Sequence, residues 1–69
     1  MRISARNQLA GSVVEVSPGA VTTTVKVRLA GGDVMTSSIT KEAADELGLA
    51  PGSDVVVVVK ASDVMLAVE

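Results

Sequence analysis

The chain has 69 residues and a formal net charge of −2, and it contains no Cys, no His and no aromatic residue. Disulfide bridges and Cys/His metal sites are therefore excluded, and six dispersed basic residues without an aromatic ring disfavour a nucleic-acid partner. A chain this short forms one domain with a barely sufficient core, so we expect a single domain over residues 1–69 that is stabilised by oligomerisation.

The N-terminal part of the chain has the alternation of β-strands, although not cleanly. Residues 2–7 alternate loosely between apolar and polar types and predict a short strand. Residues 8–16 predict a second strand, but Val13, Val14 and Val16 cannot all share one face of a regular strand. The turn Ser-Pro-Gly that follows ends this strand, because Pro fixes φ and Gly accepts a positive value.

A clearer hairpin follows. Residues 21–29 alternate strictly, with Val, Thr and Leu on one face and Thr, Lys and Arg on the other. The Gly-Gly-Asp sequence at residues 31–33 predicts a turn, and residues 34–39 supply a returning strand. The sequence therefore predicts an antiparallel pair with one face exposed to solvent.

One short helix is expected over residues 41–47. Thr40 is a suitable N-cap, and Glu42 in the first turn complements the helix dipole. Gly48 ends the helix, with Pro-Gly shortly beyond. The inward-facing stripe consists of Ala43, Ala44 and Leu47.

Five consecutive valines at residues 55–59 predict a strand that is covered on both faces, because the run has no alternation. A chain of 69 residues cannot easily supply both covering layers, which again favours an oligomer. Residues 64–68 predict a final alternating strand. The expected fold class is all-β: a small OB-like β-barrel of five or six short strands with one short helix.

No targeting or membrane signal is expected from the sequence. The first four residues lead into no apolar signal-peptide core, and no apolar stretch reaches membrane-spanning length. We therefore predict a cytoplasmic protein that contacts no membrane.

Three short segments carry more hydrogen-bond donors than folding requires. They are Ser4-Ala5-Arg6-Asn7, the hydroxyl-rich residues 36–40, and Lys60-Ala61-Ser62. Each has an ordinary structural interpretation: Arg6 in solvent, Thr40 as a helix cap, and Lys60 reaching solvent from a strand end. Together they provide cations, hydroxyls and backbone amides without an apolar element, an inventory that suits a small tetrahedral dianion.

Catalysis finds little support in the same residues, so we expect a protein that is not an enzyme. Without His or Cys the usual nucleophile and base pairs are missing. The carboxylates occupy a solvated helix face or turns, where acidic residues are expected. No catalytic residue, catalytic cofactor or direct metal ligand is predicted.

The segments that carry these donors resemble those of the molbindins, small molybdate-binding proteins built from the TOBE-type domain. The resemblance rests on Ser-Ala-Arg-Asn near the N-terminus, Ile-Thr before a short helix ending in Leu-Gly-Leu, Pro-Gly, and a β-branched strand ending in Val-Lys-Ala-Ser. It implies small β-barrels that exchange strands, assemble as a hexamer (a trimer of dimers), and bind molybdate or tungstate at subunit interfaces.

The resemblance also implies particular site residues. One subunit would supply Ser4, Ala5, Arg6 and Asn7, and its neighbour would supply Thr40, Lys60, Ala61 and Ser62. A serine that a relative has three residues beyond the threonine is Ala43 here, so that hydroxyl is missing. Candidates for a second class of anion site are Gly19 and Ala20.

As a free-standing domain, the chain is expected to serve in the storage and homeostasis of molybdate or tungstate. The metal would be bound only as its oxyanion. The alternative is a structural or accessory TOBE module of a molybdate transport or regulatory system that has no storage role. The first alternative predicts that micromolar molybdate raises the melting temperature, and the second does not.

Overall fold

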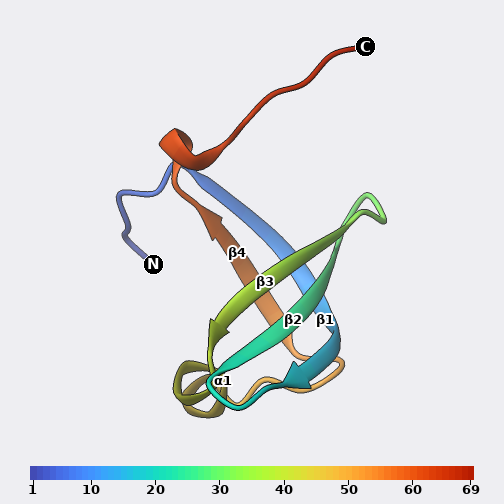
Figure 1. Ribbon diagram of the computed structural model, residues 1–69. Coiled ribbons are helices and arrows are strands. Elements are labelled where there is room, and N and C mark those ends of the chain that lie inside the picture. Colours follow the sequence, from blue (N-terminus) through green and yellow to red (C-terminus); the bar gives the residue numbers. More distant parts are fainter.

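The computed structural model describes residues 1–69 as one curled antiparallel sheet with a short helix (Figure 1). The strands have the order β3-β2-β1-β4 in the sheet. The elements are β1 Asn7–Pro18, β2 Thr22–Leu29, β3 Val34–Thr40, α1 Lys41–Leu47, β4 Asp54–Val59 and the 3₁₀ turn η1 Ala61–Asp63. None of the helical segments has the length and apolar character needed to span a membrane.

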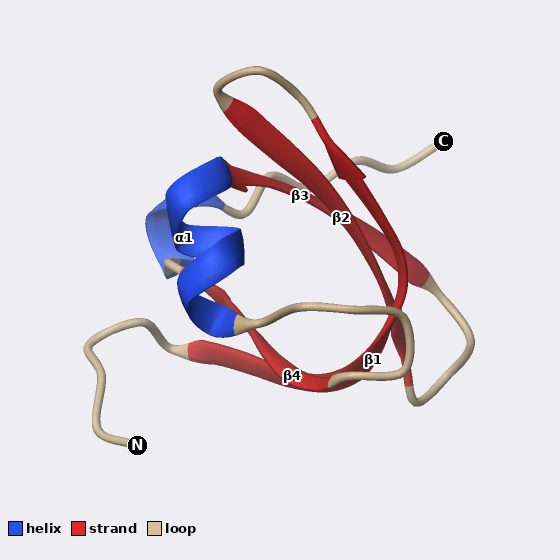
Figure 2. Cartoon of the chain, turned by 90° about the horizontal axis from the view of Figure 1, so that it is seen from below, coloured by secondary structure: helices blue, strands red, loops and turns tan.

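The β2–β3 turn and the caps of α1 form where the sequence predicts them, whereas Ser17 and Pro18 of the predicted Ser-Pro-Gly turn still belong to β1 and pair with β2. The hairpin between β2 and β3 contains Gly32 at φ +95°, a conformation that costs glycine little. The Thr40 side chain accepts a hydrogen bond from the Ala43 amide at 3.1 Å, and Gly48 ends α1 in the left-handed conformation at φ +62°. The expected helix over residues 41–47 is therefore confirmed, and it lies beside β3 as the sheet curls past it toward β4 (Figure 2).

The core lies on the inner face of the curled sheet. Val13, Val25 and Val27 are buried together, with Val13 directly opposite Val27 in the pairing of β1 with β2. The register of that pairing shifts between Val13 and Glu15. This irregularity places both Val13 and Val16 against the core and leaves Val14 39% exposed, which resolves the imperfect alternation of β1.

The valine strand alternates in burial within a single chain. Val55 and Val57 pack against the core, whereas Val56 and Val58 on the other face are 49% and 38% exposed. The chain by itself thus covers one face of β4. The other face carries apolar side chains of a kind that a solvent-facing strand seldom places there.

The all-β class with one short helix is confirmed, but the number of strands differs from the prediction. Four strands form rather than five or six, because residues 2–6 and 64–68 make no ladder. A strand needs a neighbour to satisfy its backbone groups, and the segment after η1 runs away from the sheet (Figure 1). In that segment Leu66 and Val68 are 92% and 97% exposed.

Candidate anion-binding site

The N-terminal segment meets the end of β4 within the same chain. Asn7 is the first residue of β1 and pairs with Val59, the last residue of β4. The Asn7 side-chain amide also donates to the Val59 carbonyl oxygen at 3.2 Å, which fixes the two strand ends together. Ser4–Asn7 and Lys60–Ser62 therefore lie at one end of the molecule, which we call the β1–β4 end.

Two cations flank the last residue pair at the β1–β4 end. Arg6 immediately precedes Asn7, and Lys60 immediately follows Val59. The one ion pair in the structure joins Lys26 to Glu15 at 3.5 Å, so neither Arg6 nor Lys60 has a carboxylate within salt-bridge distance. Both side chains are exposed, which leaves two positive charges next to the same residue pair, without an ion-pair partner and free to attract an anion.

The segment after Lys60 adds further donors. In η1 the amides of Asp63 and Val64 donate to the carbonyl oxygens of Lys60 and Ala61 at 2.9 and 3.2 Å. The amides of Ala61 and Ser62 come before these donors and are not used by the turn. The β1–β4 end thus gathers cations, hydroxyls and amides, which all stabilise negative charge.

Thr40 lies at the opposite end of the molecule, where α1 begins. It pairs with Thr22 at the far end of the sheet from Asn7. The 12 residues of β1, at ~3.3 Å per residue, put roughly 35 Å of strand between these ends. Figure 1 likewise shows α1 and η1 at opposite ends. Within one chain, therefore, Thr40 cannot contact the same small anion as Lys60.

The grouping within one chain differs from the grouping predicted for the assembly. The resemblance assigns Lys60–Ser62 and Thr40 to one subunit and Ser4–Asn7 to its neighbour. The single chain instead unites Ser4–Asn7 with Lys60–Ser62 and separates both from Thr40. A site that uses all of these residues therefore needs a second copy to bring Thr40 to the β1–β4 end.

Gly19 and Ala20 lie near Thr40 rather than at the β1–β4 end. They form the exposed turn between β1 and β2, where the Gly19 amide donates to the Thr22 carbonyl oxygen at 2.8 Å. The Lys41 amide donates to the Val21 carbonyl oxygen at 2.9 Å, which ties this turn to the start of α1. The candidate second site thus shares its end of the molecule with Thr40.

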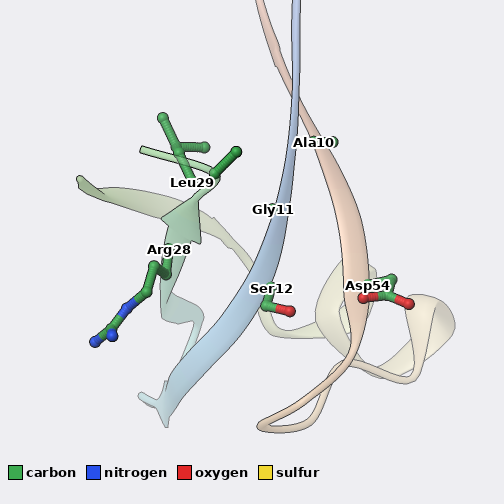
Figure 3. Close-up of a pocket in the computed structure, with 7 residues that line it drawn as sticks. Ala10, Gly11, Ser12, Arg28, Leu29 and Asp54 are labelled. Atoms are coloured by element: carbon green, nitrogen blue, oxygen red, sulfur yellow. The ribbon is translucent and has the colours of Figure 1, made fainter. Parts of the chain in front are cut away.

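A hollow of about 410 Å³ contains none of the residues that the sequence predicted for anion binding. It lies over β1, and Ser12 in its floor pairs with Arg28 on one side and Asp54 on the other (Figure 3). A carboxylate facing the hollow opposes the binding of a dianion. Only the strand register places these three residues side by side, so no motif in the sequence indicates the hollow.

A second hollow of about 200 Å³ is apolar and lies between β3 and β4, the two outer strands of the sheet. We call it the β3–β4 groove. Nine of its ten lining residues are hydrophobic, which reflects the run of valines in the sequence. They are Val25, Val27, Ile39, Leu47, Leu49, Val55, Val56, Val57 and Val58, with Ser37 as the polar member.

Comparison with known proteins gives matches over nearly the whole chain. Molybdenum-pterin-binding protein 3 of Clostridium pasteurianum is 47% identical over 66 residues, covering 96% of this chain and 97% of that protein. A molybdate-binding protein from Sporomusa ovata has a similar structure, with a TM-score of 0.92 and 31% identity over 97% of this chain and 98% of that one. The cytoplasmic molybdate-binding protein ModG, solved with molybdate bound, gives a TM-score of 0.96 and 49% identity over 100% of this chain and 49% of its own.

The family match agrees with the motifs and with the fold. The TOBE domain matches residues 3–66, from the start of the Ser-Ala-Arg-Asn segment to beyond η1. The resemblance to the TOBE-type molbindins is confirmed by these matches. The chain belongs to the TOBE domain family.

Proposed function

We propose that the chain binds molybdate or tungstate and serves in the intracellular storage and homeostasis of that oxyanion. The observation that carries this proposal is the β1–β4 end, where Arg6 and Lys60 flank the last residue pair and have no carboxylate partner. The binding of molybdate by relatives that match across this chain supports the choice of anion.

The chemistry of these groups favours a dianion over a neutral ligand. Guanidinium, ammonium and backbone amide groups donate hydrogen bonds and accept none. Hydrogen bonds to charged groups are stronger than neutral ones, so a tetrahedral dianion would satisfy many of these donors at once. The proposed contacts come from Ser4, Ala5, Arg6, Asn7, Lys60, Ala61 and Ser62.

The complete site is proposed to form between subunits of a homo-oligomer, most simply a hexamer with exchanged strands. Thr40 of another copy would reach the β1–β4 end, and Gly19 and Ala20 would contribute to a second class of site. The unpaired outer edges of β3 and β4 and the exposed side chains of Val56 and Val58 support the assembly, because both are surfaces that a second copy can cover.

The segment proposed to be exchanged is the C-terminal tail, residues 64–69. Its apolar residues alternate, and it pairs with no strand of its own chain. The β3–β4 groove is apolar and has a free strand edge on each side, so it can accept such a segment from a second copy. The whole chain would then act as one oxyanion-binding domain, cytoplasmic and without catalytic activity.

Thermal unfolding with and without molybdate tests the proposed function. A ligand that binds only the folded state stabilises it by RT ln(1 + [L]/Kd), which is about 2.7 kcal/mol at one hundred times Kd. Micromolar molybdate should therefore raise the melting temperature by several degrees, as should tungstate. An unchanged melting temperature would instead indicate an accessory module whose anion site is not functional.

A further inference from the structure

One side chain ties the ends of β1 and β4 together. The structure has three hydrogen bonds that involve a side chain, and two of them join residues only three apart. The third joins residues 52 apart: the Asn7 side-chain amide donates to the Val59 carbonyl oxygen at 3.2 Å. Asn7 is half-buried, so water competes less for this bond than for a fully exposed one.

This tie acts on the last pair of the ladder. The pairing of β1 with β4 ends at Asn7 and Val59, and the residues before Asn7 form no strand. A pair at the end of a ladder frays most readily, because it has an ordered neighbour on one side only. The bond from the Asn7 side chain therefore strengthens the ladder where it is weakest.

Both unpaired cations are attached to the tied pair. If the ladder continued by one residue, its register would make Arg6 and Lys60 the next opposed pair. Each cation is joined by one peptide bond to Asn7 or to Val59. Figure 1 shows the N-terminal segment and η1 leaving the sheet at this end. The separation of the two cations thus depends on how firmly Asn7 and Val59 are held together.

We propose that Asn7 is a positioning residue, which fixes the spacing of Arg6 and Lys60 and thereby makes the site select molybdate over the smaller sulfate. The inference rests on the proposed function and adds the source of its selectivity. A carboxamide has two N–H groups, and the one that fixes the spacing is donated to Val59. This role is therefore separate from a direct contact between Asn7 and the anion.

Selectivity by size requires donors that cannot move freely. Donors held at the spacing of a larger anion make long hydrogen bonds to a smaller one, and long bonds are weak. When the strand ends are loosened, the cations can close around sulfate and recover these bonds. Molybdate gains nothing from the looser site and must order it on binding. Loosening should therefore weaken molybdate binding more than sulfate binding.

A pair of isosteric substitutions tests the role of Asn7 in the full-length protein. Asn7→Leu keeps the shape of the side chain and removes its donor. Gln8→Met is the matched control, since Gln8 is the next residue of β1, pairs with Val58, and uses its amide in no hydrogen bond. Competition calorimetry with sodium molybdate and sodium sulfate measures both affinities.

The expected result is a change in the ratio of the two affinities. Asn7→Leu should bind molybdate about tenfold more weakly, as the loss of one hydrogen bond's contribution implies. Its sulfate affinity should stay within about twofold of wild type, because lost order and closer contacts oppose each other. Gln8→Met should keep the wild-type value for both anions. Asn7→Ser, whose shorter side chain has no donor at the position of the amide nitrogen, should show the same fall in the ratio, and it serves if Asn7→Leu does not fold.

The outcomes that overturn this role differ from failure of the proposed function. A wild type that binds no molybdate overturns both, and wild type alone reveals it. A wild type that binds molybdate and sulfate equally overturns only the selectivity. Equal weakening of both anions in the Asn7 variants also overturns it, because a direct contact or a purely structural role would act on both alike. An unchanged ratio in those variants, or the same change in Gln8→Met, has the same consequence.

Discussion

At the scale of single residues, Arg6 and Lys60 have charges that the folded chain does not neutralise. Folding gains nothing from an ion pair at either position, since no carboxylate lies within salt-bridge distance of them. Two like charges beside one residue pair repel each other when no anion is bound. Their placement is therefore explained by a ligand more readily than by stability.

Replacing either cation should weaken anion binding and leave folding almost unchanged. A hydrogen bond to a charged group contributes roughly 1.5–3 kcal/mol, and 1.4 kcal/mol is a factor of ten in affinity. We expect Arg6→Ala and Lys60→Ala each to lower molybdate affinity by about tenfold to a hundredfold. Calorimetry measures the affinity, and urea unfolding should give a free energy within about 0.5 kcal/mol of wild type.

Arg28→Ala is the matched control for these two variants. Arg28 is also an exposed arginine without an ion pair, but it lies at the hollow over β1, away from the β1–β4 end. This variant should keep wild-type affinity. If Arg6→Ala and Lys60→Ala also bind molybdate as wild type does, the proposed site is wrong.

Thr23 is a residue whose environment the sequence could not reveal. It is 1% exposed, and its hydroxyl oxygen Oγ1 has no hydrogen-bond partner. The alternation of β2 correctly places it on the inner face, but alternation does not show whether a buried hydroxyl finds a partner. A buried polar group without a partner costs free energy that an apolar side chain of the same shape would not.

Exchanging Thr and Val within β2 should therefore change stability in opposite directions. We expect Thr23→Val to raise the free energy of unfolding by about 1 kcal/mol, since it removes an unsatisfied hydroxyl. Val25→Thr, at an equally buried position of the same face, should lower it by about 1–3 kcal/mol. Urea unfolding checks both, and destabilisation by Thr23→Val would mean that the hydroxyl has a partner in the assembled protein.

At the scale of elements, α1 and the β2–β3 hairpin could be predicted because their signals are local. A cap, a stop glycine and a turn sequence each act within a few residues. The irregularity in β1 depends on pairing with β2, so the sequence showed only that Val13, Val14 and Val16 conflict. The tail alternates like a strand, but the pattern does not specify a partner, and the single chain provides none.

The candidate site, too, could be predicted from the sequence only in part. The residue types at Ser4–Asn7 and Lys60–Ser62 indicated an anion from their chemistry, and the register of β1 with β4 explains why they meet. The sequence could not specify where Thr40 lies relative to Lys60, because that distance depends on the whole sheet. The cap that Thr40 forms with the Ala43 amide is local and could be predicted. Its part in anion binding stays a prediction about the assembly.

Two substitutions at Thr40 separate its role as a cap from its proposed role in binding. Thr40→Ala removes the cap and should cost about 1 kcal/mol of stability. Thr40→Asp keeps a good cap but places a carboxylate beside the anion, so its stability should stay near that of wild type while molybdate affinity falls more than tenfold. Thermal unfolding and calorimetry give the two values. If Thr40→Asp binds molybdate with wild-type affinity, Thr40 acts only as a helix cap and takes no part in anion binding.

At the scale of the whole molecule, the single chain leaves apolar surface that a stable monomer would bury. Only four hydrophobic residues are buried: Val13, Val25, Val27 and Ala44. The β3–β4 groove, the outer face of β4 and the tail are all apolar and partly or largely exposed. Covering them with further copies would remove this surface from water, at about 25 cal/mol for each Å² of apolar area.

We therefore expect an obligate oligomer, with a hexamer as the main species in native mass spectrometry at micromolar concentration. A chain ending at Asp63 lacks the tail and should fail to form this assembly. Light scattering on both proteins provides an independent measure of mass. A full-length chain that stays a stable folded monomer would contradict the expectation.

The central claim is a site built for a molybdate-like dianion rather than a general anion patch. Phosphate is partly protonated near neutral pH, and its O–H groups would find few acceptors among Arg6, Lys60 and the amides of η1. An unpaired donor costs roughly 1–3 kcal/mol, and a site shaped for molybdate would leave the smaller sulfate too far from some of its donors.

Competition calorimetry at fixed pH and ionic strength tests this claim most directly. It should place molybdate and tungstate first, sulfate well behind, and phosphate last, at least tenfold weaker than molybdate. Equal affinity for molybdate and phosphate would contradict the claim and show that this end of the molecule attracts anions by charge alone.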